Sequence, residues 1–146
     1  MLNLTSLIEP LFVSAGWNPI PIGRPQPDEV ASGHARALEV LNQFGGLHVG
    51  QTGPGTEQAA SDVHFYALPR PDLSAIIYPW TPEVGVCAAF ATAHNDHMIL
   101  FVNDAGEYFV FTNPDECLYK LAGTFGEAMQ TLLWGYRYGL PLARHG

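Results

Sequence analysis

The sequence predicts an α+β fold in a single domain over residues 1–146, and two observations lead to this class. Apolar residues repeat at helical spacing in two segments before residue 48 and in one segment after residue 123. Between them, from residue 62 onward, short runs of β-branched and aromatic residues are separated by Pro, Asn, Asp or Gly. Helices, then a series of strands, then a closing helix are typical of α+β domains.

The first predicted helix covers residues 4–15 and ends at Gly16. Pro10 lies inside this pattern, so we expect it to kink the helix or to confine it to shorter pieces. Trp17 follows directly and is expected to pack back onto the helix. The apolar residues that define its face are Leu4, Leu7, Ile8, Leu11, Phe12 and Ala15.

The second predicted helix, in residues 34–47 (HARALEVLNQFGGL), is the most distinctive local feature of the chain. It follows residues 18–27, whose four prolines indicate an extended connector. Gly45 and Gly46 end the helix, because glycine accepts the left-handed conformation that closes a helix. Its apolar face is formed by Ala37, Leu38, Leu41 and Phe44.

The strands are expected after a Gly-rich loop at residues 50–61. Residues 103–106 (NDAG) join two of the runs and indicate a tight hairpin, with Gly106 where a positive φ is needed. Several runs are apolar throughout, as expected for strands that are covered on both faces. Residues 118–121 are expected to add an edge strand. The runs are VHFYAL (63–68), AIIY (75–78), VCAAFAT (86–92), HMILFV (97–102) and EYFVFT (107–112).

The closing helix begins with a capping box at Thr124 and Glu127, in which the two residues satisfy each other's backbone donors. Pro141 excludes much further helix. The apolar face of this helix is formed by Phe125, Ala128, Met129, Leu132 and Leu133.

The charge of the chain limits its partners. The chain has 14 acidic and 6 basic residues, for a formal net charge of −8. Such a surface repels phosphate backbones and anionic membranes, so we expect no direct binding to nucleic acid or membrane and an attraction to basic protein surfaces. The plainer interpretation, solubility alone, is equally compatible with this charge. Two cysteines form no disulfide framework, and no signal peptide or membrane span is evident, which predicts a cytoplasmic protein.

Candidate catalytic and metal-binding residues form no recognisable set. His94 and His97 flank Asp96, but they lie at a loop-to-strand junction with no further ligand near in sequence. Cys87 has apolar neighbours that would not stabilise a thiolate, so we expect an inert core thiol. His48 and His64 lie on separate strands and could meet across a sheet. We therefore expect no enzyme, no cofactor, no metal and no catalytic residue.

Four stretches in order resemble the SUKH superfamily of bacterial immunity proteins, specifically its third subfamily. They are Ala15-Gly16-Trp17, the segment 34–47, the hairpin 101–111 (FVNDAGEYFVF) and the closing helix 124–135 (TFGEAMQTLLWG). The resemblance implies a mixed, mostly antiparallel sheet of about five to six strands, flanked by N-terminal helices and a C-terminal helix.

The resemblance also implies a function. Such proteins bind and neutralise a cognate polymorphic toxin, such as a nuclease or nucleic-acid deaminase, by stoichiometric protein-protein interaction. The alternative is a regulatory or scaffold module that binds an endogenous protein. On either interpretation we expect a monomer or weak dimer.

Candidate partner-binding residues are acids in loops beside aromatic side chains, because interfaces favour aromatic anchors ringed by polar groups. Trp80, between Pro79 and Pro82, is the aromatic residue that we most readily place on the surface. The full set is Glu57, Asp62, Tyr66, Asp72, Tyr78, Trp80, Glu83, Asp115 and Glu116.

Overall fold

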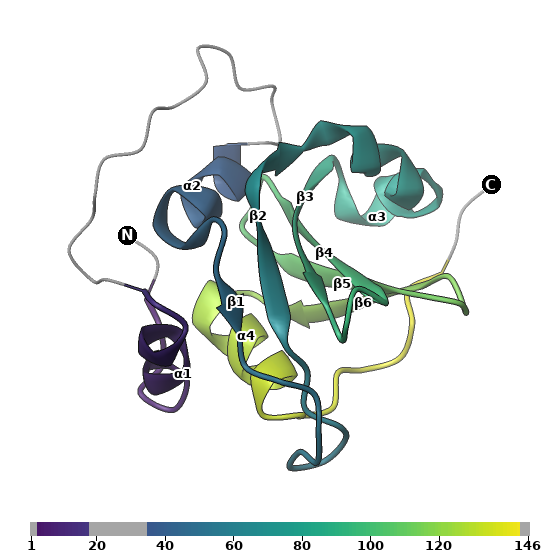
Figure 1. The fold of residues 1–146 in the computed structure, drawn as a ribbon. Coiled ribbons are helices and arrows are strands. Elements are labelled where there is room, and N and C mark those ends of the chain that lie inside the picture. Colours follow the sequence, from purple (N-terminus) through teal and green to yellow (C-terminus); the bar gives the residue numbers. More distant parts are fainter. Residues whose placement is uncertain (1–2, 18–34, 144–146) are drawn as a thin grey trace.

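The computed structural model describes residues 3–17 and 35–143, and its centre is a six-stranded sheet in the order β1-β2-β3-β4-β5-β6 (Figure 1). Every neighbouring pair of these strands is antiparallel. The α+β class is confirmed, and the described sheet has no parallel pair. The strands are β1 (His48–Val49), β2 (Val63–Arg70), β3 (Cys87–Ala93), β4 (Met98–Asn103), β5 (Tyr108–Thr112) and β6 (Cys117–Ala122).

Three α-helices lie on one side of the sheet: α1 (Glu9–Ser14), α2 (Ala35–Phe44) and α4 (Phe125–Leu133) (Figure 1). α1 is shorter than predicted because it begins next to Pro10, which occupies its first turn. The N–H groups of a first turn make no intrahelical hydrogen bond, so proline, which lacks this N–H, is tolerated there. Thr124 caps α4 as predicted, since its side chain accepts a hydrogen bond from the backbone N of Glu127 (3.3 Å). The predicted connector at residues 18–27 lies outside the described residues.

Aromatic side chains dominate the core under these helices. Phe44 of α2 stacks on Phe125 of α4, with ring centroids 5.0 Å apart, and meets Phe12 of α1 edge to face at the same distance. Phe65 of β2 packs against all three rings. Trp17 also lies against Phe44 (5.8 Å), which confirms that it packs back onto the core. The predicted helix at 34–47 therefore supplies the ring that joins the two ends of the chain.

The opposite face is partly covered by a 3-10 helix, η1 (Pro71–Trp80), and the short helix α3 (Thr81–Val84). The predicted strand AIIY at 75–78 was wrong, because these residues form part of η1. A short apolar run does not distinguish strand from helix. In η1 the 3-10 period of three residues places Ile77 and Trp80 on one side, where both are buried against the sheet.

The strands show why their sequences are apolar throughout. Along β4, Leu100 and Val102 belong to the core under the α-helices, whereas Phe101 belongs to the core under η1 and α3. Successive side chains of a strand point to opposite faces, so a sheet with both faces covered needs apolar residues at every position. The hairpin after β4 contains Gly106 at φ 79, as predicted.

Candidate functional site

η1 and α3 cover only part of the sheet face on which they lie. The part without a covering helix is at the lower end of the sheet in Figure 1. Four residues form a row across this region, one on each of the strands β1 to β4. His48 pairs with His64, His64 with Thr92, and Thr92 with Ile99. Both histidines are exposed, and Thr92 and Ile99 are half-buried. We call this region the open sheet face, and define it as His48, His64, Tyr66, Thr92 and Ile99.

The two histidines meet across β1 and β2 as the sequence suggested, with ring centroids 5.0 Å apart in a stacked arrangement. Beyond Ile99, the same row continues through Phe111 to Leu118, which are 6 % and 0 % exposed. The row therefore passes from an exposed half to a buried half. The sequence did not indicate Thr92 or Ile99, because both lie in runs that are otherwise apolar. The polar side chain of Thr92 within VCAAFAT was the available signal.

At one border of the open sheet face, Arg70 and Asp72 lie beside Tyr66. The guanidinium of Arg70 lies 5.3 Å from the centre of the Tyr66 ring, within the range of a cation–π contact. Arg70 also donates two hydrogen bonds to Asp72, from Nε to Oδ1 (3.1 Å) and from a terminal nitrogen to Oδ2 (2.9 Å). These bonds hold the pKa of Asp72 below its ordinary value. Tyr66 and Asp72 were separate candidates in the sequence analysis, and the structure joins them through Arg70, which that analysis did not name.

Asp62 lies beneath this surface rather than on it, because it is only 5 % exposed. Its Oδ2 lies 2.6 Å from Nε2 of His48, and its Oδ1 accepts a hydrogen bond from the backbone N of Asn95 (2.9 Å). Burial raises the pKa of Asp62, but the bonds from Asn95 and His48 outweigh it, and the net effect lowers the pKa. Asp62 was expected in a partner-binding loop; the structure shows it as a brace for the turn between β3 and β4.

The braced turn is unusual, since His94, Asn95 and Asp96 all have a positive φ (52°, 53° and 69°). Non-glycine residues adopt this conformation at a cost of about 1 kcal/mol or more each, so other contacts must hold it. Asp96 accepts a hydrogen bond from the hydroxyl of Thr92 (2.6 Å), which places its carboxylate at the border of the open sheet face.

The residues predicted around η1 and α3 lie elsewhere. Trp80 was expected on the surface, and this was wrong: it is 1 % exposed, its ring meets Phe111 edge to face at 5.9 Å, and its Nε1 donates to the carbonyl of Leu142 (3.1 Å). The flanking prolines indicated a loop, but they lie in η1 and α3, which close over the core. Tyr78 (67 % exposed) and Glu83 are on the outside of this cover.

The remaining three candidates lie apart from the open sheet face. Glu57 is exposed in the loop before β2 and accepts a hydrogen bond from the backbone N of Arg137 (3.0 Å). Asp115 and Glu116 are exposed in the turn between β5 and β6. The Asp115 carboxylate accepts a hydrogen bond from the hydroxyl of Thr112, which contributes to the conformation of this turn.

Cys87 and the histidine candidates His94 and His97 lie among the described residues. Cys87 is a buried free thiol, as predicted, and burial raises its pKa to about 12, so it is not a nucleophile at neutral pH. Within the same part of the chain, no three His, Cys, Asp or Glu side chains are grouped so that they could hold a metal ion. None of its helices is both long and apolar enough to cross a membrane.

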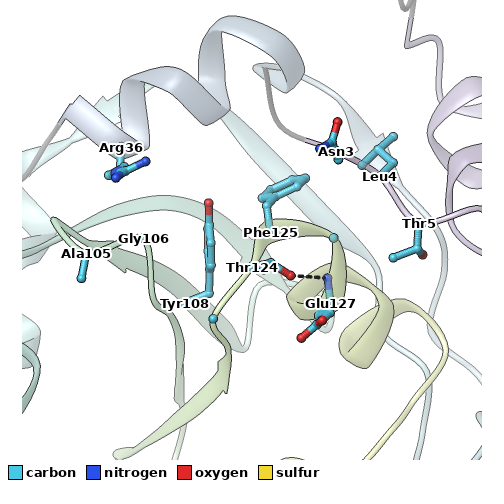
Figure 2. Close-up of a pocket in the computed structure, with 12 residues that line it drawn as sticks. Asn3, Leu4, Thr5, Arg36, Ala105, Gly106, Tyr108, Thr124, Phe125 and Glu127 are labelled. Carbon is cyan, nitrogen blue, oxygen red and sulfur yellow. Dashed lines mark hydrogen bonds between the residues drawn. The ribbon is translucent and has the colours of Figure 1, made fainter.

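A hollow of about 430 Å³ lies at the other end of the sheet, between the first turn of α2, the β4–β5 turn and the start of α4 (Figure 2). Arg36 borders it, and its Nε donates a hydrogen bond to the carbonyl of Asp104 (3.3 Å). A terminal nitrogen of Arg36 lies 3.9 Å from the Oε2 of Glu39. Tyr108 also lines it, and burial raises the pKa of this phenol to about 12, so its hydroxyl stays neutral. Thr5, Thr124 and Glu127 also line the hollow.

Comparison with models of known protein families gives a match. The model of the family described as SUKH-3 immunity protein matches residues 26–135, a range that includes α2, all six strands and α4. Comparisons with curated proteins and with solved structures give no match.

Proposed function

Because this chain belongs to the SUKH-3 immunity protein family, we propose that it binds a cognate polymorphic toxin domain with a basic surface and neutralises it stoichiometrically. The family supplies the general function, immunity against a toxin. The finer statement concerns the kind of toxin. We propose a nuclease or a nucleic-acid deaminase, because enzymes that grip phosphates present clusters of Lys and Arg.

The charge of the chain is the observation that carries this finer proposal. The formal net charge is −8, and ion pairs already engage Arg36, Arg70 and Lys120 with acidic neighbours. Acidic side chains therefore dominate the surface that a partner meets. Complementary charge accelerates association and disfavours partners of the same sign, which suits an inhibitor that must reach its toxin before the toxin acts.

Inhibition by coverage fits the chemistry of the chain better than inhibition by catalysis. Burial raises the pKa of the Cys87 thiol to about 12, which favours its unreactive protonated form. A protein that blocks a toxin by coverage needs a rigid surface and no reactive group. Both the packed sheet and the braced turn at residues 94–96 supply rigidity.

Co-expression tests the proposal. The toxin domain encoded next to this chain's own gene is expressed in cells with this chain and, separately, without it. As a specificity control, this chain is expressed with a toxin of a different family. We expect this chain to restore growth against its neighbour's product and to form a one-to-one complex with it at low salt. Growth arrest that persists at full expression of this chain, together with no complex at low salt, would refute the proposal.

A further inference from the structure

We propose that the open sheet face docks the toxin, and that the surface it accepts is a basic protein surface. The inference rests on the proposed function and names the part of this chain that performs it. Three properties carry it: the face has no covering element among the described residues, its bordering side chains are hydrogen-bonded within the chain, and its charged border residues Arg70, Asp72 and Asp96 sum to one negative charge.

The first property is that this part of the sheet is unpartnered. The row of register partners from His48 to Leu118 lies on one face, yet η1 and α3 bury only its far half. Ile99 and Tyr66 pack against the edge of that core and remain half-buried. A region with a half-buried aromatic and a half-buried aliphatic side chain, ringed by polar groups, has the composition of an interface centre.

The second property is that several side chains at this face already have hydrogen-bond partners within the chain. Arg70 lies over the ring of Tyr66 and donates two hydrogen bonds to Asp72. Asp62 braces the turn that presents Asp96, and Thr92 holds the Asp96 carboxylate. Ordering a free side chain at an interface costs about 0.5–1.5 kcal/mol, so a surface with its rotamers already fixed loses less on binding.

The third property is charge, and it selects the occupant. Among the residues of the open sheet face and its borders, Arg70 carries the one fixed positive charge, and Asp72 neutralises it. Asp96 remains at the border, and the ionised Asp62 lies just beneath His48. A second copy of this chain would bring its own net charge of −8 to this surface, so electrostatics disfavours self-association there. A partner with Lys and Arg on its surface is favoured for the same reason.

A pair of double variants with the same change in formal charge tests the inference. The first, His64→Arg/Asp96→Asn, makes the open sheet face more positive, and asparagine tolerates the positive φ at position 96. The control, Glu9→Gln/Val13→Arg, makes the same change on α1, on the other side of the sheet (Figure 1). Both control residues are exposed. Circular dichroism and urea unfolding confirm that each variant is folded.

Affinity for the toxin domain encoded beside this chain's gene is then measured by calorimetry at fixed ionic strength. We expect the dissociation constant of the open-face variant to rise at least about tenfold, and that of the control to rise less than about threefold. In wild-type protein labelled with ¹⁵N, addition of the same toxin domain should shift the amide signals of residues 64–66 and 92–99, and leave those of α1 unchanged.

The outcomes separate this inference from the proposed function. Wild-type protein that neither binds nor protects refutes the proposed function. Wild-type protein that protects, with equal effects of the two double variants or with amide shifts outside the open sheet face, overturns the docking site alone. A wild-type dimer that the open-face variant abolishes would also overturn it, because a second copy would then be the occupant.

Discussion

Replacing Asp62 with alanine should destabilise the fold by about 2–3 kcal/mol. The hydrogen bond from the backbone N of Asn95 to the carboxylate is charge-assisted and contributes about 2 kcal/mol. The contact with His48 adds less than about 1 kcal/mol, because the imidazole is 57 % exposed and water screens it. The three positive-φ residues of the turn relax once the brace is lost, which limits the total cost.

Urea unfolding followed by circular dichroism at pH 7 measures this change. Asp62→Asn is the matched control, since its amide oxygen still accepts from Asn95, and we expect it to lose about half as much stability. His48→Ala should cost less than about 1 kcal/mol. An Asp62→Ala variant within about 0.5 kcal/mol of the wild type would show that the carboxylate does not support the turn.

The same carboxylate predicts the pH dependence. The folded pKa of Asp62 lies below its ordinary value of 3.8, so the unfolded chain binds this proton more tightly than the folded chain. Its stabilisation is therefore fully present above the unfolded pKa and is lost as pH falls through the folded pKa. The stability difference between wild type and Asp62→Asn should shrink as pH falls below about 4. A difference that stays constant into acid would contradict this assignment.

Four further predictions concern the core, the thiols, one glycine and the partner. Trp80→Ala should lower the free energy of unfolding in urea by about 3–5 kcal/mol, because the Trp80 side chain is 1 % exposed and its removal leaves a cavity in the core. A loss under about 1 kcal/mol would contradict the burial of Trp80. A disulfide reagent should modify Cys117 but not Cys87 in folded protein at pH 8, and both in urea. Gly135→Ala should cost more than about 2 kcal/mol, since Gly135 has φ 70 and an added Cβ would lie 2.2 Å from the carbonyl oxygen of Gln58. The association rate with the toxin domain should fall roughly tenfold between about 0.01 M and about 1 M ionic strength, and a flat profile in stopped-flow would contradict electrostatic steering.

Sequence reasoning named some of the residues at the open sheet face and did not name others. Tyr66 was named beside Asp62, and Asp72 was named beside Tyr78. The structure brings Tyr66 and Asp72 together through Arg70, and their role in partner binding stays a prediction. Thr92 and Ile99 were not named, because each lies in a run that is otherwise apolar. Their exposure depends on the length of η1 and α3, which end before they cover this half of the sheet.

Sequence alone determined the features that depend on neighbouring residues. Helical spacing in residues 34–47, the Thr124 cap and the turn at Gly106 each arise from residues a few positions apart, so local physical chemistry decides them. The negative charge, a property of composition, was equally accessible.

Tertiary structure decided the features that depend on distant residues. Residues 71–80 form a 3-10 helix because Ile77 and Trp80 find their apolar partners on the sheet, and Trp80 is buried because Phe111 and Leu142 receive it. The row that begins at His48 is assembled by the register of consecutive strands, which brings together residues about fifty positions apart. Burial and register are properties of the packed chain, because both depend on which distant surfaces meet.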